Sequence, residues 1–352
     1  MELLNLGKVP WLESQSIYHA LATLGRETLV LLSPSTPYVC IGFHQDLEQE
    51  VDVDFCRKND IPIIRREVGG GAVYLDGNQF FFQLILDKEN PEIPRNKESF
   101  YKKFLQPIIE TYRAIGVPAE YKPINDLVAG TRKVSGTGVG EIGDCVVFVG
   151  NIIMDFNYEM MARVLKVPDE KFRDKVHKTI EANLSTIIRE LGAEEAGKWD
   201  EERVNSLMVE EWGKLLGPME PGEIDSELQA KMDELSVEMM GDEWLYQKGK
   251  LASGRDIKIR AGVNMVHKMH KAIGGLIRAD FEVAEGILGD VSLSGDFFCF
   301  PDDAVTRLEA KLEGRPIEET RALVEGFYSD KEIDTPGIGI EDWLQVLDAG
   351  AV

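Results

Sequence analysis

Residues 65–76 read Arg65-Arg66-Glu67-Val68-Gly69-Gly70-Gly71-Ala72-Val73-Tyr74-Leu75-Asp76. A β-branched run at 61–64 precedes this segment and an apolar run at 80–86 follows it, so both flanks predict strands. Three consecutive glycines between two strands are costly in conformational entropy, which indicates that side chains would obstruct something there. We interpret the segment as a turn whose backbone N–H groups approach a phosphate-bearing ligand, with Arg65 and Arg66 neutralising its charge. A plain glycine-rich hairpin is the alternative.

Composition and charge limit the classes of protein to which the chain can belong. Its 352 residues suffice for two domains, and 43% hydrophobic with 29% charged residues is typical of a globular protein. No apolar run approaches the roughly 20 residues of a membrane span, and the N-terminus lacks the basic region of a secretory signal. The four cysteines have no CxxC spacing, which predicts reduced thiols. The reduced thiols predict a cytoplasmic protein, and the lack of an apolar span predicts one that does not enter a membrane. The net charge of −23 argues against nucleic acid as a partner.

A second informative segment covers residues 124–138 and centres on one lysine. It reads Ile124-Asn125-Asp126-Leu127-Val128-Ala129-Gly130-Thr131-Arg132-Lys133-Val134-Ser135-Gly136-Thr137-Gly138. The pattern predicts a strand that turns at Ala129–Gly130 and returns through Lys133, with small residues after it. An inward-facing Lys133 would place a compact ammonium against a phosphate or a developing oxyanion. The alternatives are an exposed hairpin lysine and, for Asn125-Asp126, an Asx-type turn.

The remaining sequence predicts an α+β protein with a second, smaller domain. We expect a linker at 241–249 and then a meander of strands at 257–263, 272–283 and 287–297, followed by one or two helices over 302–329. The tail from Asp334 to Val352 looks loosely packed. The spacing of His267 and His270 does not predict a metal site. The predicted division is 1–240 for the larger domain, 241–249 for the linker, 250–330 for the smaller domain and 331–352 for a C-terminal tail.

Together these segments resemble the lipoate–protein ligase family, part of the group of biotin/lipoate ligases and octanoyltransferases. The resemblance is carried by Arg65-Arg66, Gly69-Gly70-Gly71-Ala72-Val73-Tyr74, Asp76, Asn125-Asp126 and Arg132-Lys133-Val134-Ser135-Gly136. It covers about residues 1–240, and residues 250–330 are similar to the small accessory domain that such ligases carry. The resemblance implies a mixed β-sheet flanked by helices for the catalytic domain.

The resemblance also implies a reaction in two steps, with ATP, Mg²⁺ and lipoate as cofactor and substrates. Lipoate first attacks the α-phosphate of ATP to give lipoyl-adenylate and pyrophosphate. A lysine of a lipoyl domain or another carrier protein then takes the lipoyl group and releases AMP. Lys133 would stabilise charge in both steps, and Asp126 would position Mg²⁺–phosphate or the incoming amine. The implied substrate-binding residues are Arg65, Arg66, Gly69, Gly70, Gly71, Ala72, Val73, Tyr74, Asp76, Asn125, Ser135 and Gly136.

The chain departs from the family pattern at two positions beside the glycine turn. Val68 stands where the family commonly has serine, and Leu75 where it commonly has histidine. These departures predict altered acyl selection and a dedicated acceptor. Because acceptor domains are often acidic, we expect the basic residues 171–178 to dock the acceptor; a solvated helix face is the alternative.

Two other functions are weighed against the ligase. An octanoyl- or lipoyltransferase of the same fold would need a reactive cysteine in the region of residues 121–125, which has none. Cys145 enters an apolar strand, where burial would raise the pKa of its thiol and make it unreactive. A non-catalytic lipoyl- or nucleotide-binding protein would have no need to retain Lys133 and both arginines.

Overall fold

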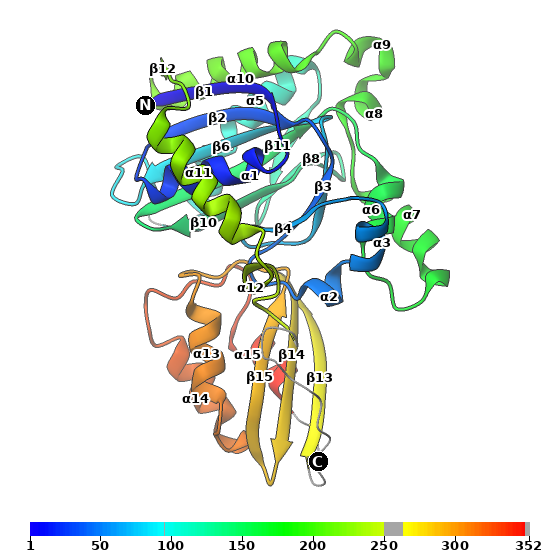
Figure 1. Cartoon of the computed structure of the whole chain (residues 1–352), viewed down its shortest axis with the longest axis vertical. Coiled ribbons are helices and arrows are strands. Elements are labelled where there is room, and N and C mark those ends of the chain that lie inside the picture. Colours follow the sequence, from blue (N-terminus) through cyan, green and yellow to red (C-terminus); the bar gives the residue numbers. More distant parts are fainter. Residues whose placement is uncertain (95, 250–262, 349–352) are drawn as a thin grey trace. The chain divides into compact units, whose positions relative to one another are not determined.

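The computed structural model describes residues 1–94, 96–249 and 263–348 (Figure 1). The chain divides into two compact units. Unit 1 comprises residues 1–40, 52–64 and 73–240, and unit 2 comprises residues 41–51, 65–72 and 241–352. Two segments that come early in the sequence, 41–51 and 65–72, therefore belong with the C-terminal part. As a result, the glycine turn is part of unit 2, whereas Lys133 is part of unit 1.

Unit 1 contains a six-stranded mixed sheet in the order β10-β11-β6-β2-β1-β12. Its strands are β1 (Glu2–Val9), β2 (Thr28–Pro34), β6 (Gln79–Asp87), β10 (Thr137–Ile142), β11 (Cys145–Ile153) and β12 (Glu220–Pro221). β1 pairs in parallel with β2 and β12, and the other pairs are antiparallel. β2 is buried along its whole length and β6 along nearly all of it, as their largely apolar sequences predict.

Unit 1 also contains several helical elements (Figure 1). They are α1 (Glu13–Thr23), α3 (Val53–Lys58), α4 (Lys97–Phe104), α5 (Gln106–Ile115), α6 (Tyr158–Val164), η1 (Glu170–Phe172), α7 (Arg173–Asn183), α8 (Ile187–Leu191), α9 (Ala193–Ala196), α10 (Glu201–Leu216) and α11 (Ser226–Met239). α1 and α10 contact strands of the six-stranded sheet, α1 also packs against α11, and α5 packs against α10. Buried rings fill the core, with the centroids of Phe82 and Phe148 5.3 Å apart and Trp212 beside them.

Two small three-stranded sheets carry the motifs. One has the order β4-β3-β5, with β3 (Tyr38–Ile41), β4 (Ile63–Arg65) and β5 (Val73–Leu75). The other has the order β7-β8-β9, with β7 (Ala119–Lys122), β8 (Asp126–Ala129) and β9 (Arg132–Ser135). The predicted turn at Ala129–Gly130 is confirmed, and Gly130 has a φ of +60°, a left-handed conformation that suits glycine.

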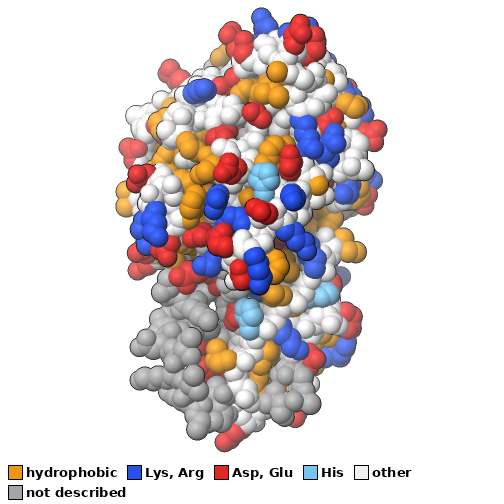
Figure 2. All heavy atoms as spheres, turned by 90° about the vertical axis from the view of Figure 1, so that its right-hand side faces the viewer, with side chains coloured by type: hydrophobic (Ala, Val, Ile, Leu, Met, Phe, Trp, Pro, Cys, Tyr) orange, Lys and Arg blue, Asp and Glu red, His pale blue; other side chains and the backbone are white. Residues whose placement is uncertain are grey.

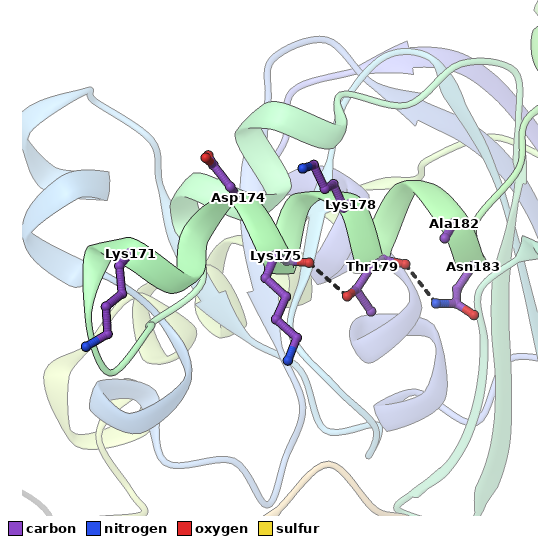
Figure 3. Close-up of a pocket in the computed structure, with 7 residues that line it drawn as sticks. All are labelled: Lys171, Asp174, Lys175, Lys178, Thr179, Ala182 and Asn183. Atoms are coloured by element: carbon purple, nitrogen blue, oxygen red, sulfur yellow. Dashed lines mark hydrogen bonds between the residues drawn. The ribbon is translucent and has the colours of Figure 1, made fainter.

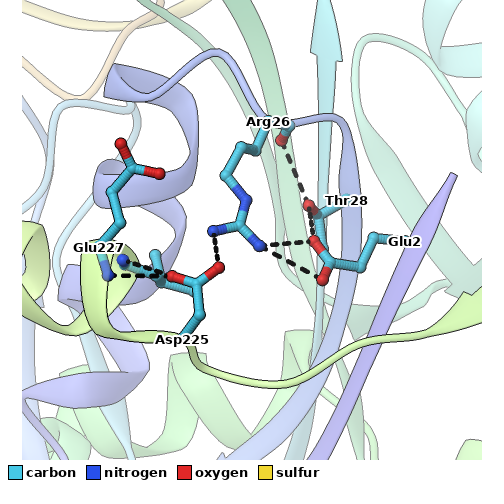
Figure 4. Close-up of polar contacts among 6 residues, drawn as sticks. Glu2, Arg26, Thr28, Asp225 and Glu227 are labelled. Atoms are coloured by element: carbon cyan, nitrogen blue, oxygen red, sulfur yellow. Dashed lines mark hydrogen bonds and ion pairs between the residues drawn. The ribbon is translucent and has the colours of Figure 1, made fainter.

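An ion-pair cluster joins the N-terminus of unit 1 to α11 (Figure 4). The Arg26 guanidinium lies between two carboxylates, 2.8 Å from Asp225 Oδ2 and 3.0 Å from Glu2 Oε2. Asp225 also caps α11 by accepting the Leu228 N–H at 2.9 Å. That backbone hydrogen bond and the neighbouring Arg26 hold the pKa of the Asp225 carboxyl below its usual value. This contribution to stability is therefore present at neutral pH and is lost as the pH falls through the carboxyl pKa.

Replacing Arg26 by alanine should lower the free energy of unfolding by about 1–2 kcal/mol, because it removes charge-assisted hydrogen bonds to two carboxylates. Urea denaturation at neutral pH measures the change. Arg57→Ala is the control, since both partners of the Arg57–Asp54 pair are more than 70% exposed, and it should change stability by less than about 0.5 kcal/mol. Equal effects of the two substitutions would contradict the role of the cluster.

Unit 2 is a three-stranded antiparallel sheet with helices (Figure 1). Its elements are α2 (Leu47–Glu50), α12 (Asp242–Leu245), β13 (Val263–Ala272), β14 (Gly275–Ala284), β15 (Ile287–Gly295), α13 (Ala304–Leu312), η2 (Ile317–Glu319), α14 (Thr320–Phe327) and α15 (Ile340–Leu347). The three strands β13, β14 and β15 follow one another in the sequence, and the helices α13, α14 and α15 come after them. This segregation of strands and helices confirms the α+β class. Its core includes Phe281 and Phe297, with the ring of Phe297 5.6 Å from that of Trp343.

Two expectations for the C-terminal part need correction, and a third falls mostly outside the described residues. Residues 334–348 are not loosely packed, because α15 places Trp343 fully inside the core of unit 2. The predicted linker contains α12, whose carbonyl groups bind Arg65. The strand predicted at 257–263 lies outside the described residues except for Val263, and β13 instead continues to Ala272. His267 and His270 lie on β13 and pair with Asp280 and Asp342. No helix in the described ranges is long and apolar enough to cross a membrane.

Candidate active site

The glycine turn is closed by the Arg66 side chain. Its guanidinium folds back over the turn and donates to the carbonyl oxygens of Gly69 at 2.8 Å and Gly71 at 3.0 Å. The Gly70 N–H donates to the Phe297 carbonyl at 3.2 Å. Arg66 therefore stabilises the turn itself, and its role toward phosphate stays a prediction.

At two of the three positions, the surrounding structure itself explains why the residue is glycine. A Cβ at Gly69 would lie 2.6 Å from the Phe297 carbonyl oxygen, a backbone atom that cannot easily move. Gly70 has a φ of +93°, which an L-residue rarely adopts. Gly71 differs, because the nearest atom to its Cβ would be Asp296 Cβ at 3.6 Å, an ordinary contact. Of the triplet, only Gly71 lacks an explanation in the packing of the described residues.

The Arg65 side chain hydrogen-bonds to several of the loops around the turn. It is fully buried, and its Nη1 donates to the carbonyl oxygens of residues 42, 43 and 45 at 2.6–3.1 Å. Its Nε and Nη2 reach the carbonyl oxygens of Trp244 and Leu245 in α12. Trp244 returns a hydrogen bond to the Arg65 carbonyl at 2.9 Å. These contacts join segments 41–51 and 65–72 to the C-terminal residues of unit 2, and a direct substrate contact by Arg65 stays a prediction.

His44 packs among these loops as a buried ring and does not act in proton transfer. Its ring stacks on Phe297 at 5.0 Å, and the side chain is 1% exposed. Burial, with the nearby positive charges of Lys248 and Arg65, lowers the pKa of His44 to about 3. The imidazole is therefore neutral at physiological pH.

Lys133 and Asp126 meet on the β8–β9 hairpin of unit 1. The Lys133 Nζ lies 2.7 Å from Asp126 Oδ1, and about a third of each side chain is exposed, 35% and 30%. Solvent and a ligand can therefore reach the pair, unlike the buried Arg65. Two residues of the predicted motif, Lys133 and Asp126, therefore form an ion pair, and this pair orients the Lys133 ammonium.

Contacts of the neighbouring predicted residues brace this hairpin. The Asn125 side chain donates to the Thr137 carbonyl at 2.9 Å, and the Thr137 hydroxyl donates back to the Asn125 carbonyl at 2.6 Å. Ser135 is fully buried, and its hydroxyl donates to the Asn151 carbonyl at 2.6 Å. Gly136 N–H donates to Asn151 Oδ1 at 2.8 Å. Asn125, Ser135 and Gly136 use these groups to shape the hairpin, and contacts to adenylate stay predictions.

The residues after the glycine turn enter unit 1 at Val73. Ala72 and Val73 are half-buried, whereas Tyr74 is 4% exposed and its N–H donates to Met161 Sδ at 3.2 Å. Burial raises the pKa of the Asp76 carboxyl, and the nearby Asp155 adds to this effect. Asp76 also accepts the Asn78 N–H at 2.9 Å.

The two positions that depart from the family pattern are interior ones. Val68 is fully buried and Leu75 is 8% exposed. Apolar side chains suit these places, since a serine or histidine buried there would need hydrogen-bond partners. The effect of the two departures on acyl selection stays a prediction.

The cysteines do not supply a reactive thiol. All four are buried. Burial raises the pKa of Cys145, as predicted, and raises the pKa of Cys56 to about 11 and that of Cys299 to about 12. Cys40 is 1% exposed. Thiols in such environments remain protonated and react slowly.

No group of three or more His, Cys, Asp or Glu within the described residues could hold a metal ion on its own. Mg²⁺, however, is usually bound through one or two carboxylates together with substrate phosphates. The half-exposed Asp126 carboxylate fits that kind of site.

The basic segment forms a hollow of about 500 Å³ along α7 (Figure 3). Its lining residues are Lys171, Asp174, Lys175, Lys178, Thr179, Ala182 and Asn183. In Figure 3, Lys171 and Lys175 point to one side of the helix, and Asp174 and Lys178 to the other, as i,i+4 spacing requires. Figure 2 shows that, on this face, Lys and Arg side chains are intermixed with Asp and Glu. The positive charge of α7 is therefore local.

Two polar residues of the site were missed by sequence reasoning. Gln79 and Asn151 lie on β6 and β11, are 1% and 8% exposed, and are joined through their side-chain amides at 2.8 Å. Asn151 lies within the apolar segment 145–153, and Gln79 directly precedes the largely apolar run at 80–86. An amide within or next to such a run was the available signal, since buried polar groups require partners.

A family model for the lipoyl protein ligase A/B catalytic domain matches residues 11–212, more than half of the chain. The chain belongs to this family. Lipoate–protein ligase 1 of Staphylococcus aureus is 26% identical over 315 residues, which are 88% of each protein. The octanoyltransferase LipM of Kyrpidia tusciae is 23% identical over 244 residues, 63% of this chain and 87% of that protein. The lipoate ligase family therefore contains both kinds of relative.

Solved structures of lipoate ligases share the fold. P. falciparum LipL1 in complex with lipoate has a TM-score of 0.68 at 15% identity, covering 94% of this chain and 95% of that chain. A bipartite lipoate ligase of Thermoplasma acidophilum, described with its E2 lipoyl domain, has a TM-score of 0.59 at 23% identity, covering 69% and 94%. A lipoate-protein ligase A bound with ATP has a TM-score of 0.57 at 20% identity, covering 69% and 97%.

Proposed function

We propose that the protein is an ATP-dependent lipoate–protein ligase. In the first step a lipoate carboxylate oxygen attacks the α-phosphorus of ATP, and the bond to pyrophosphate breaks. In the second, the amine of an acceptor lysine attacks the lipoyl carbonyl carbon, AMP leaves and the amine loses a proton. The observation that carries the proposal is the solvent-accessible Lys133 ammonium, held at 2.7 Å by Asp126 on a braced hairpin.

The roles of the residues follow from their charge and accessibility. Lys133 neutralises charge that develops on the lipoyl carbonyl oxygen and the α-phosphate. Asp126 positions Lys133 before substrate binds and is the protein carboxylate that would hold Mg²⁺, which neutralises phosphate charge when bound. Because the acceptor supplies the nucleophile, the chain needs no reactive thiol of its own. The burial of its four cysteines supports this assignment over the transferase.

The test is lipoate-dependent exchange of pyrophosphate into ATP, followed by intact mass of carrier proteins incubated with ATP, Mg²⁺ and lipoate. We expect exchange and a carrier mass increase of one lipoyl group. Lipoyl or octanoyl transfer between carriers without ATP, and without exchange, would identify the transferase instead. Binding of lipoate or ATP with neither reaction would identify a binding protein.

We further propose that α7 docks an acidic acceptor domain. Residues 163–178 carry six Lys and Arg against three Asp and Glu, in a chain whose net charge is −23. Lys171, Lys175 and Lys178 are exposed, and Phe172 is 42% exposed among them. A basic surface with an apolar contact suits an acidic protein partner.

Reversing two of these charges, as Lys171→Glu together with Lys175→Glu, should raise the KM for an acidic carrier by about tenfold or more at low salt. Pyrophosphate exchange should not change, because adenylation needs no carrier. The control is Lys198→Glu with Lys214→Glu, which makes the same change of charge at two other exposed positions of unit 1. A loss of pyrophosphate exchange would show that α7 acts in adenylation. Equal increases of the carrier KM in both double variants would show that only the net charge of the protein matters, and not the position of the lysines.

A further inference from the structure

A chain of side-chain amides crosses the interior of unit 1 beneath the Lys133 hairpin. Gln79 Nε2 donates to the Tyr74 carbonyl at 3.1 Å, Asn151 Nδ2 donates to Gln79 Oε1 at 2.8 Å, and the Gly136 N–H donates to Asn151 Oδ1 at 2.8 Å. The chain therefore links β5, which follows the glycine turn, to the residues directly after Lys133. None of these amides touches the ammonium itself.

The two ends of this chain determine its direction. The Gly136 N–H can only donate, so Asn151 must present its oxygen to it and its nitrogen to Gln79. The Tyr74 carbonyl can only accept, so Gln79 must present its nitrogen there and its oxygen to Asn151. Both amides thus have one orientation that satisfies every contact, which makes the link rigid in a way that an apolar pair would not be.

Asn151 is also the principal clamp on the hairpin backbone. Its main-chain carbonyl accepts the Ser135 hydroxyl, and its N–H donates to the Gly136 carbonyl at 3.2 Å. Further contacts act on the preceding residues, where Tyr112 donates its hydroxyl to the Val134 carbonyl and Ser185 donates its N–H to the Lys133 carbonyl at 2.8 Å. Each residue from 133 to 136 therefore has at least one polar group held by a residue outside the hairpin.

We infer that Gln79 and Asn151 are positioning residues that hold the Lys133 hairpin at a fixed distance from β5. Buried amides cost free energy unless they are fully hydrogen-bonded, and two apolar side chains would fill the same space without that cost. What the amides add is geometry, since a hydrogen-bonded chain fixes the separation of its ends. Its meaning for catalysis rests on the proposed ligase function, because a small displacement of Lys133 would separate the ammonium from the charge that it stabilises.

The first test measures the hairpin without any substrate. In hydrogen–deuterium exchange, Asn151→Ala should speed exchange in the peptide covering 125–137 by about tenfold or more, with Gln79→Ala acting in the same direction. The control is Asn205→Ala, because Asn205 is also a buried amide in unit 1, 2% exposed, that donates to another amide, Asn5 Oδ1, at 2.9 Å. Unchanged exchange at 125–137, or equal acceleration by Asn205→Ala, would overturn the inference.

The second test measures catalysis with the full chain. Asn151→Ala should lower kcat for lipoyl-adenylate formation by about 10- to 100-fold and leave the KM values for ATP and lipoate nearly unchanged. Should Asn151→Ala fail to fold, Gln79→Ala breaks the link to β5 while Asn151 keeps its acceptor for the Gly136 N–H. A kcat loss no greater than that of Asn205→Ala would also overturn the inference. If the wild-type protein makes no adenylate, the ligase proposal fails, while the exchange result still decides whether the two amides position the hairpin.

Discussion

Replacing Lys133 by alanine should lower the rate of lipoyl-adenylate formation by about 10²–10³-fold, because it removes one preorganised charge from the reacting centre. The loss should not come from unfolding. The Lys133–Asp126 pair is about one-third exposed, and such pairs contribute about 1 kcal/mol or less to stability. Pyrophosphate exchange measures the first step, and transfer from preformed lipoyl-adenylate to a carrier measures the second. Both should fall, since negative charge develops on the α-phosphate in the first step and on the lipoyl carbonyl oxygen in the second.

Arg132→Ala is the matched control for Lys133→Ala. Arg132 is the preceding residue of β9, has the same exposed fraction of 35% and is also ion-paired, with Glu190 at 2.8 Å. The two substitutions remove the same charge from the same strand, yet only Lys133 is proposed to act on the reacting groups. Comparable losses of activity would assign the effect to the strand and not to the Lys133 ammonium.

Asp126→Asn separates the two roles given to this carboxylate. If Asp126 only positions Lys133, Asp126→Asn should have little effect in the Lys133→Ala background. If Asp126 also holds Mg²⁺, the double variant should lose more activity than Lys133→Ala, and its rate should need more Mg²⁺ for saturation.

The second large effect is expected at the glycine turn, where Gly69→Ala and Gly71→Ala should behave differently. Gly69→Ala places a Cβ 2.6 Å from the Phe297 carbonyl oxygen and should lower the stability of unit 2 by about 1–3 kcal/mol, with adenylation falling as the turn is displaced. Gly71→Ala meets nothing closer than 3.6 Å and should leave stability within about 0.5 kcal/mol.

Gly71→Ala should nevertheless raise the KM for lipoate by about tenfold or more if, as proposed, a ligand closely approaches the backbone at this position. Thermal unfolding and pyrophosphate exchange, measured on both variants, give the two readouts. Wild-type kinetics for Gly71→Ala would favour the plain glycine-rich hairpin. Point substitutions are better suited here than deletion of the C-terminal residues, because the turn belongs to the same unit as those residues.

Local sequence patterns determined much of the site. The β-branched and apolar runs around the glycines predict strands that the structure confirms, and alternation with a turn at Gly130 places Lys133 and Asp126 on one hairpin. These features depend on residues close in sequence, since burial periodicity and turn geometry are local properties. The motif residues could therefore be found without any tertiary information.

Only the tertiary structure decided which segments hold those motifs in place. It assigned 41–51 and 65–72 to the C-terminal unit through the buried guanidinium of Arg65, and it set Phe297 against Gly70. It also paired Gln79 with Asn151, which are 72 residues apart. A sequence pattern records that a residue will be buried, but its partner depends on how distant segments pack, because hydrogen bonding and close packing act between neighbours in space and not along the chain.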